Sequence, residues 1–169
     1  MTPSFAAAVY TPKQADKTAL PNFLQYLKDN HVLVAGILQE SYIKEGHTTR
    51  TIESVDITTG QRTKIKRPMR SENDCGLDAS NLAETSETLR AAIAAKPDLI
   101  LFEKFGDQEQ TGAGLSDEIM QIISEGIPFL IAVPEPALTI WQERTGELGQ
   151  VIKFTKDDML NWWQNIKKT

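Results

Sequence analysis

Four short apolar runs, each bounded by charged or turn-forming residues, predict buried parallel strands over residues 4–10, 32–38, 98–105 and 127–133. A shorter run predicts a last strand over residues 151–154. Between the runs, apolar residues recur at helical spacing, which predicts helices over residues 18–30, 78–95, 115–124, 136–144 and 157–167. Strands that alternate with helices in this way indicate a three-layer α/β fold, in which a mostly parallel sheet lies between two layers of helices.

The pattern changes its period over residues 48–67. Ile52, Val55 and Ile57 are interleaved with polar residues, a turn signal follows at 58–61, and alternation resumes over 62–66. This pattern predicts an antiparallel hairpin, inserted between the second strand and the next helix. No linker, repeat or low-complexity tract interrupts the 169 residues, so we expect a single α/β domain over residues 1–169.

Charge and composition narrow the range of partners and compartments. The formal net charge is −5, and no basic patch covers the chain as a whole, which argues against nucleic acid as the main partner. No apolar stretch approaches the roughly 20 residues needed to cross a bilayer, and residues 1–10 do not read as a secretory signal. The single cysteine excludes an internal disulfide and is typical of a reducing compartment. We therefore expect a cytoplasmic protein.

Charged residues gather at the carboxyl end of the strand predicted over 98–105, where Glu103 and Lys104 are followed by Gly106 and Glu109. In open α/β sheets, ligands bind beyond the carboxyl ends of such strands. Glu103 is therefore a candidate Mg²⁺ ligand, directly or through water. Lys104 stands where a hydrolase needs a carboxylate base; an ammonium group cannot activate water at neutral pH, but it can neutralise a bound anion. The alternative is that Glu103 and Lys104 pair with each other or with basic residues of the hairpin.

The loop after the first strand, residues 11–18, ends in Lys17-Thr18, as a phosphate-binding loop does. Such a loop follows Gly-x-x-x-x-Gly-Lys-Ser/Thr, and its glycines let backbone N–H groups surround the phosphates. Here Thr11 and Asp16 replace the two glycines. At about 4 Å, the Asp16 carboxylate would repel a phosphate charge by roughly 4 kcal/mol at an effective dielectric of about 20. The loop is therefore a degenerate phosphate loop, or an ordinary strand–helix connection that Asp16 caps. We expect it to share a crevice with the end of the strand at 98–105.

A cysteine and a basic cluster are two further candidate features. Cys75 lies between a basic stretch and a predicted helix start, which favours a reactive thiolate, although Glu72 and Asp74 oppose it. It is a candidate ligand-binding residue or nucleophile, or else a partly buried inert thiol. Five basic residues lie within nine positions and form either a solvated strand face or a surface for an anion or an acidic partner: Arg62, Lys64, Lys66, Arg67 and Arg70.

Several segments together resemble a bacterial domain-of-unknown-function family whose members often occur beside molybdate transport or molybdenum and nitrogen-fixation genes. The more specific segments are Cys75-Gly76-Leu77-Asp78 and Lys104-Phe105-Gly106-Asp107-Gln108-Glu109. Residues 6–10, 34–39, 82–83, 112–115 and 126–128 extend the resemblance over nearly the whole chain. More distantly, the layout is similar to the small nucleoside triphosphatases first described from thermophiles, whose Walker B segment reads Asp-Glu-Ile-Gly-x-x-Glu. Glu103 matches its Asp, Lys104 replaces its first Glu, and Gly106 and Glu109 are kept.

The resemblance implies a P-loop NTPase-like topology, and the departures from it put hydrolysis in question. We expect a small-anion or nucleotide-binding protein on a degenerate P-loop scaffold, linked to molybdenum metabolism. The alternatives are a slow nucleoside triphosphatase in which Glu109 is the candidate catalytic base, and a regulatory or interaction module without a ligand, which engages a partner through the basic hairpin and Cys75. A homodimer and a complex with another protein are the two protein assemblies considered. The expected cofactor is Mg²⁺ with a nucleotide, or the ligand is an oxyanion such as molybdate. The candidate ligand-binding residues are Lys13, Lys17, Thr18, Gln39, Cys75, Asp78, Glu103, Lys104, Gly106 and Glu109.

Overall fold

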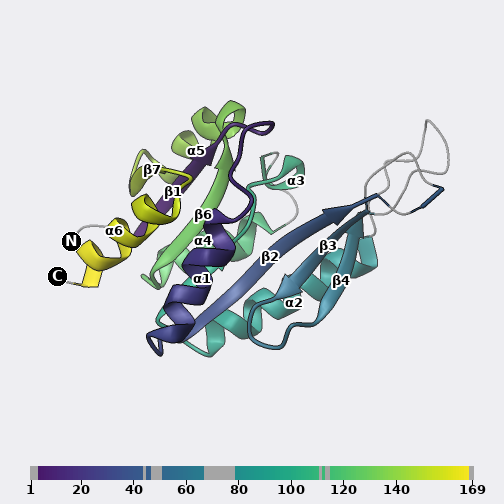
Figure 1. Cartoon of the computed structure of the whole chain (residues 1–169), viewed down its shortest axis with the longest axis horizontal. Helices are drawn as coiled ribbons and strands as arrows, with labels where there is room; N and C mark the ends of the chain where they lie inside the picture. Colours follow the sequence, from purple (N-terminus) through teal and green to yellow (C-terminus); the bar gives the residue numbers. More distant parts are fainter. Residues whose placement is uncertain are drawn as a thin grey trace.

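The structure, a computed structural model, describes residues 4–43, 45–46, 51–66, 79–110, 112 and 115–167. Within these residues, seven strands form one sheet in the order β4-β3-β2-β5-β6-β1-β7 (Figure 1). The strands are β1 (Phe5–Tyr10), β2 (Val34–Tyr42), β3 (Thr51–Asp56), β4 (Arg62–Lys66), β5 (Leu99–Phe102), β6 (Phe129–Pro134) and β7 (Gln150–Lys153). Strands β2, β5, β6, β1 and β7 run parallel, and the hairpin β3–β4 joins the edge of β2 antiparallel. The mostly parallel sheet and the hairpin are therefore confirmed.

Helices cover both faces of the sheet, which confirms the three-layer prediction. α1 (Ala19–Asp29) and α6 (Lys156–Lys167) lie on one face, and α2 (Ala79–Ala94), α4 (Ser116–Ser124) and α5 (Leu138–Thr145) lie on the other (Figure 1). Alternate residues of β5 feed the two apolar clusters, because successive side chains of a strand point to opposite faces. Leu99 and Leu101 pack on the α1–α6 side, and Ile100 and Phe102 pack on the α2–α4–α5 side.

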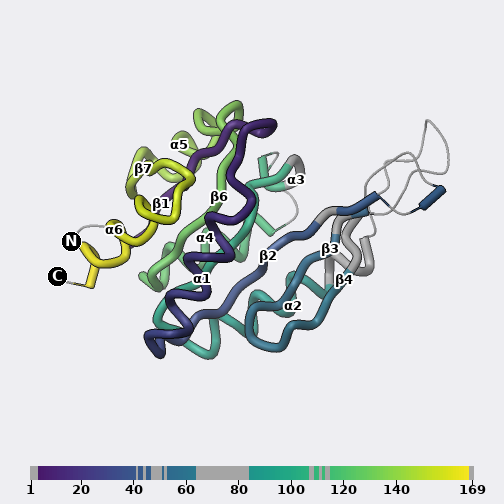
Figure 2. The backbone as a smooth tube through the Cα atoms, in the orientation of Figure 1, coloured from purple at the N-terminus to yellow at the C-terminus, as the bar shows by residue number. Residues whose placement is uncertain are grey.

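Strand β2 is longer than predicted because it changes partners halfway along. Its first residues, from Val34 to Ile37, pair with β5, and its residues from Ile37 to Tyr42 pair with β3. Its second half therefore leaves the body of the sheet and forms an arm with β3 and β4 (Figure 2). Gly36 lies at the change of partners with φ +125°, and its carbonyl accepts the Ile57 N–H.

Two connections contain short helices. The connection after β5 contains a single helical turn, α3 (Asp107–Gln110), and β6 leads through the 3₁₀ turn η1 (Glu135–Ala137) into α5. In the part of the chain that is described, none of the helices has both the length and the apolar character needed to cross a bilayer.

Candidate functional site

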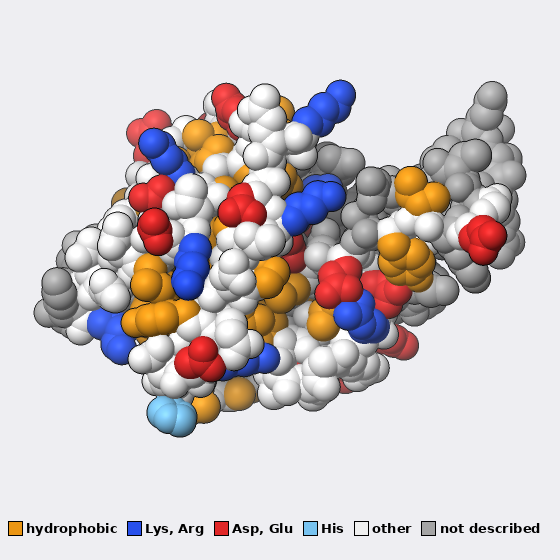
Figure 3. Space-filling model, viewed as in Figure 1, with side chains coloured by type: hydrophobic (Ala, Val, Ile, Leu, Met, Phe, Trp, Pro, Cys, Tyr) orange, Lys and Arg blue, Asp and Glu red, His pale blue; other side chains and the backbone are white. Residues whose placement is uncertain are grey.

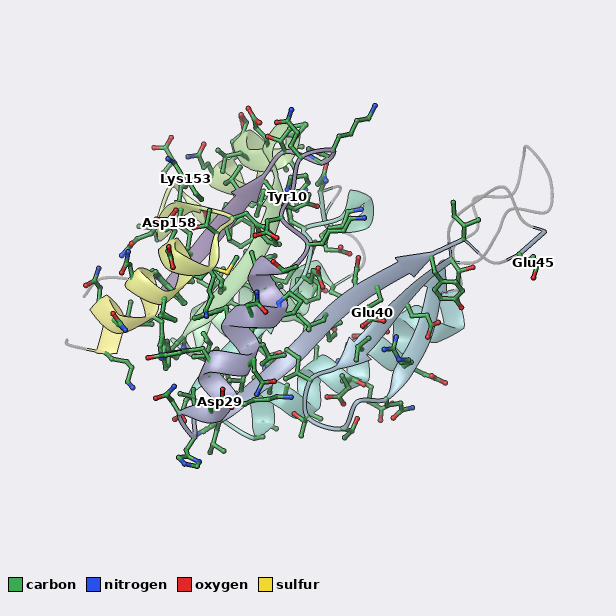
Figure 4. All side chains as sticks on the ribbon, in the orientation of Figure 1. Tyr10, Asp29, Glu40, Glu45, Lys153 and Asp158 are labelled. Carbon is green, nitrogen blue, oxygen red and sulfur yellow. The ribbon has the colours of Figure 1, made fainter. Side chains whose placement is uncertain are left out.

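A cleft of about 530 Å³ opens at the carboxyl ends of several parallel strands. Tyr10 ends β1, Glu40 lies in the second half of β2, and Figure 4 labels both side chains. The lining residues come from β1, β2 and β6, from the segment after β5, from the loop before α1 with its first turn, and from the residue after β7: Tyr10, Pro12, Ala15, Lys17, Pro21, Leu38, Gln39, Glu40, Glu103, Lys104, Ala132 and Phe154. The loop after β1 and the end of β5 thus share a crevice, as the sequence predicts.

In the loop before α1, the Asp16 carboxylate accepts a backbone N–H of the kind that a phosphate loop offers to its ligand. The backbone N–H of Thr18 donates to Asp16 Oδ1 at 2.9 Å, and the Thr18 hydroxyl donates to the same oxygen at 2.6 Å. These bonds, the hydroxyl bond first, hold the pKa of Asp16 below its ordinary value. The N-cap of α1 is Thr18, without a side-chain cap hydrogen bond, so the Asp16 carboxylate closes the turn before the helix and does not cap the helix itself. Lys17 lines the cleft, whereas Lys13 is exposed in the preceding turn and is not among the lining residues.

A one-residue bulge follows β5. The Ile100 N–H donates to the Pro128 carbonyl of β6, and the Phe105 N–H donates to the Ala132 carbonyl. From one bond to the next the β5 side advances five positions, from Ile100 to Phe105, whereas β6 advances four, from Pro128 to Ala132, so one residue is extra. Lys104 is that residue, and its φ is +93°. The strand predicted to run to Phe105 therefore ends at Phe102, because the ladder breaks there.

Glu103 is tied to β2 by two hydrogen bonds. Its N–H donates to the Ile37 carbonyl at 2.8 Å, and its carboxylate Oε2 accepts the Gln39 N–H at 2.6 Å. In a regular parallel ladder a backbone carbonyl would accept the Gln39 N–H. Where the bulge begins, the Glu103 carboxylate accepts it instead. Burial raises the pKa of Glu103 above its ordinary value, and Glu40 raises it further; the Gln39 N–H and Lys104 act against this.

The raised pKa of Glu103 predicts a pH-dependent stability. The folded state binds a proton to Glu103 more tightly than the unfolded chain does. Stability from this residue is therefore greatest below the unfolded pKa, and is lost as the pH rises from there through the folded pKa. We expect Glu103→Gln, whose amide oxygen can still accept the Gln39 N–H, to lack this loss. Urea unfolding of both proteins from about pH 4 upward checks it, and parallel curves would contradict it.

Glu109 holds the loop that follows the bulge. Its Oε1 accepts the Gly106 N–H at 3.1 Å, and its Oε2 accepts the Leu115 N–H at 3.2 Å. The side chain is buried, and neither Glu109 nor Gly106 is among the residues that line the cleft. This arrangement favours a structural role for Glu109 over the role of catalytic base.

The described part of the basic cluster is an ion pair at the root of the arm. The Arg62 guanidinium contacts the Glu40 carboxylate across β3, and acidic and basic side chains meet there on the face shown in Figure 3. The pKa of Arg62 is raised, chiefly by its hydrogen bond to Glu40. The other predicted features of this region, namely Cys75, Asp78, Arg67, Arg70 and the side chains of Lys64 and Lys66, lie outside the described residues.

An aromatic pair at the cleft was not predicted from the sequence. Tyr10 and Phe154 have ring centroids 5.4 Å apart and an interplanar angle of 59°. They lie at the carboxyl ends of the neighbouring strands β1 and β7. The strand-end rule that singles out Glu103 applies equally to both residues and could have found them. Leu38, the last residue of the predicted strand, was also missed, as was Glu40, which lines the cleft because β2 continues beyond its predicted end.

A solved structure shares the fold described above. Over 98% of this chain and 96% of the other, the structure is similar to the crystal structure of THEP1 from the hyperthermophile Aquifex aeolicus, with a TM-score of 0.61 and 14% sequence identity. The P-loop NTPase-like fold expected from the sequence is thus confirmed, and at this identity the likeness concerns the fold alone.

Sequence comparison identifies the family. The chain is 36% identical over 162 residues to "Molybdenum import ATP-binding protein ModC 2" of Bradyrhizobium diazoefficiens. The match covers 95% of this chain but only 18% of that relative's length. The family profile described as "Protein of unknown function (DUF2478)" matches residues 5–162, so the resemblance to a domain-of-unknown-function family is confirmed. The chain belongs to the DUF2478 family.

Proposed function

We propose that the cleft binds a small anionic ligand without hydrolysing it efficiently. A nucleotide is the ligand that the cleft favours most. The observation that carries this proposal is the position of the cleft. It lies at the carboxyl ends of β1 and β5, and both Lys17 and Lys104 line it. This is the edge at which open α/β sheets bind their ligands. Two ammonium groups at one cleft favour an anion, although the chain as a whole is acidic.

Of the two carboxylates that line the cleft, one is paired with an arginine and the other has a raised pKa. Glu40 pairs with Arg62, and burial of Glu103 raises its pKa, which favours its neutral form. The pKa of Asp16 is lowered, which favours its charged form, and its carboxylate accepts the N–H and the hydroxyl of Thr18 just before α1. We therefore place the anionic group of the ligand between Lys17 and Lys104 and away from the N-terminus of α1.

The size and the apolar wall of the cleft favour a nucleotide over a bare oxyanion. A volume of about 530 Å³ lies within the range of about 300–1,000 Å³ that is typical of sites for organic ligands, and a single molybdate would leave most of it empty. The half-buried rings of Tyr10 and Phe154 offer an aromatic surface to a planar base. The relative named as an ATP-binding protein for molybdenum import also supports a nucleotide ligand and a link to molybdenum metabolism.

The proposal of slow or absent turnover rests on the residues around the end of β5. Lys104 lines the cleft where a hydrolase would present a carboxylate base. Glu109, the substitute considered from the sequence, uses both carboxylate oxygens to hold backbone N–H groups. Binding without hydrolysis is consistent with a sensory or regulatory protein.

Calorimetric titration of the purified protein tests this proposal. ATP, GTP and sodium molybdate are titrated separately, in buffer with Mg²⁺ and in buffer with EDTA. We expect saturable binding of at least one nucleotide at one site per chain, and weaker binding of molybdate. If none of the three ligands gives binding heat in either buffer, the proposal is wrong.

A further inference from the structure

The residues expected to hold Mg²⁺ do not fit that ion. In a phosphate loop the Ser/Thr hydroxyl contacts Mg²⁺ beside the ligand, whereas here Thr18 is not among the residues that line the cleft, and its hydroxyl donates to Asp16 Oδ1 at 2.6 Å. Glu103, the predicted Mg²⁺ ligand, accepts the Gln39 N–H at 2.6 Å through Oε2. Among the described residues, no three His, Cys, Asp or Glu side chains gather as a metal-binding group.

The bulge after β5 brings the Lys104 ammonium group to the cleft that Glu103 also lines. Side chains alternate along a strand, so a regular β5 would direct Glu103 to the α1–α6 side and Lys104 to the opposite side. The extra residue changes this, because Glu103 and Lys104 both line the cleft. Phe105 then fills the position on the opposite side, where it is buried and packs edge-to-face on Trp141 at 5.3 Å.

The bulge also holds Lys104 in an unfavourable backbone conformation. Its φ of +93° is one that residues other than glycine rarely adopt. Glycine would meet this backbone requirement better, yet the chain carries a lysine there. Backbone strain of this kind gathers at functional sites, so its presence beside the cleft favours a role for the Lys104 side chain.

We infer that Lys104 takes the place of a divalent cation, so that the cleft binds the anionic group of its ligand through Lys104 and Lys17 without requiring Mg²⁺. This inference rests on the proposed function and specifies the form of the ligand. Mg²⁺ beside the Lys104 ammonium would be repelled by it. Free ATP also carries more negative charge than its Mg²⁺ complex, so a site built from ammonium groups binds the free form at least as well.

The first test compares the dissociation constants of ATP and inorganic pyrophosphate in EDTA and in excess Mg²⁺. We expect the affinity for each probe in EDTA to equal or exceed the affinity in Mg²⁺. Affinity more than tenfold higher in Mg²⁺ would overturn the inference, because it would mean that the ion completes the site.

The second test uses three substitutions of the lysine. Lys104→Gly removes the ammonium group and relieves the backbone, so we expect a higher melting temperature together with at least tenfold weaker binding of ATP in EDTA. Lys104→Asn, which tolerates a positive φ, should also lose binding, and Lys104→Arg should retain most of it. If Lys104→Gly is more stable but binds ATP more weakly, then Lys104 contacts the ligand, because the loss of a structural residue would lower stability as well. Wild-type affinity in Lys104→Gly would overturn the inference.

The outcomes also separate this inference from the proposed function. If Lys17→Ala loses ATP binding and Lys104→Gly does not, the cleft is an anion site and the inference about Lys104 is wrong. If ATP binds only with Mg²⁺, the proposed function stands and the inference again fails. If the wild-type protein binds none of ATP, GTP, pyrophosphate and molybdate, both are wrong.

Discussion

Replacing Gly36 with alanine is expected to lower the free energy of unfolding by about 3–5 kcal/mol. An added Cβ would lie 1.9 Å from the Leu101 carbonyl oxygen of β5, and the backbone φ of +125° is already unfavourable for any other residue. The clash is with backbone, so no side-chain rotation can relieve it. Gly36 also lies where β2 exchanges β5 for the hairpin, so a shift there would disturb the strand that carries Gln39 and Glu40 to the cleft.

Gly60→Ala is the matched control for this substitution. Gly60 also has a positive φ, +77°, but an added Cβ would meet nothing within 4 Å. Its replacement should therefore cost only the backbone strain, about 1–2 kcal/mol. Urea unfolding followed by tryptophan fluorescence measures both changes, because Trp141, Trp162 and Trp163 are all buried. Equal losses in the two variants would contradict the close approach of β2 to β5.

Lys17→Ala is expected to weaken nucleotide binding about ten- to a hundredfold while leaving the fold intact. A hydrogen bond to a charged group contributes about 1.5–3 kcal/mol, which corresponds to that range of dissociation constants. Lys17 is exposed and precedes α1, so its truncation removes no buried contact. The dissociation constant of ATP by calorimetry measures the effect, and the melting temperature should stay within about 2 °C of wild type.

Lys28→Ala serves as the control for charge. Lys28 is also an exposed lysine and lies in the last turn of α1, at the end remote from the cleft. It changes the net charge by the same amount, so any general electrostatic effect should appear in both variants. We expect Lys28→Ala to bind ATP within about twofold of wild type. If both variants weaken binding equally, Lys17 has no specific contact with the ligand.

The order of the elements could be predicted from the sequence because apolar runs and helical spacing report burial directly. The strand ends could not be predicted in the same way. The strand at 98–105 is apolar up to Phe102, and Phe105 is buried as well, so hydrophobicity alone continues the strand across the bulge. The bulge depends on the hydrogen bonds to β6, which are a tertiary feature. The extension of β2 to Tyr42 depends likewise on its pairing with β3.

The candidate site was predicted where the strand-end rule applies and where the residue is charged or polar. That rule, with the phosphate-loop comparison, placed Lys17, Gln39, Glu103 and Lys104 together, and all four line the cleft. Tyr10 and Phe154 were not predicted as site residues, because aromatic residues at the ends of apolar strands are read as members of the hydrophobic core. Glu109 follows the strand closely in sequence, yet the turn α3 directs its carboxylate to the backbone of its own loop.

An ¹⁵N-resolved NMR titration of the protein with ATP tests whether the cleft at the carboxyl ends of β1 and β5 is the ligand site. We predict that the largest amide shifts fall on Lys17, Gln39 and Lys104 and on their neighbours at the carboxyl edge of the sheet. The amides of α4, on the other face, should move least. Shifts that gather on α4 or on the outer strand β4, or spectra that do not change at saturating ATP, would contradict it.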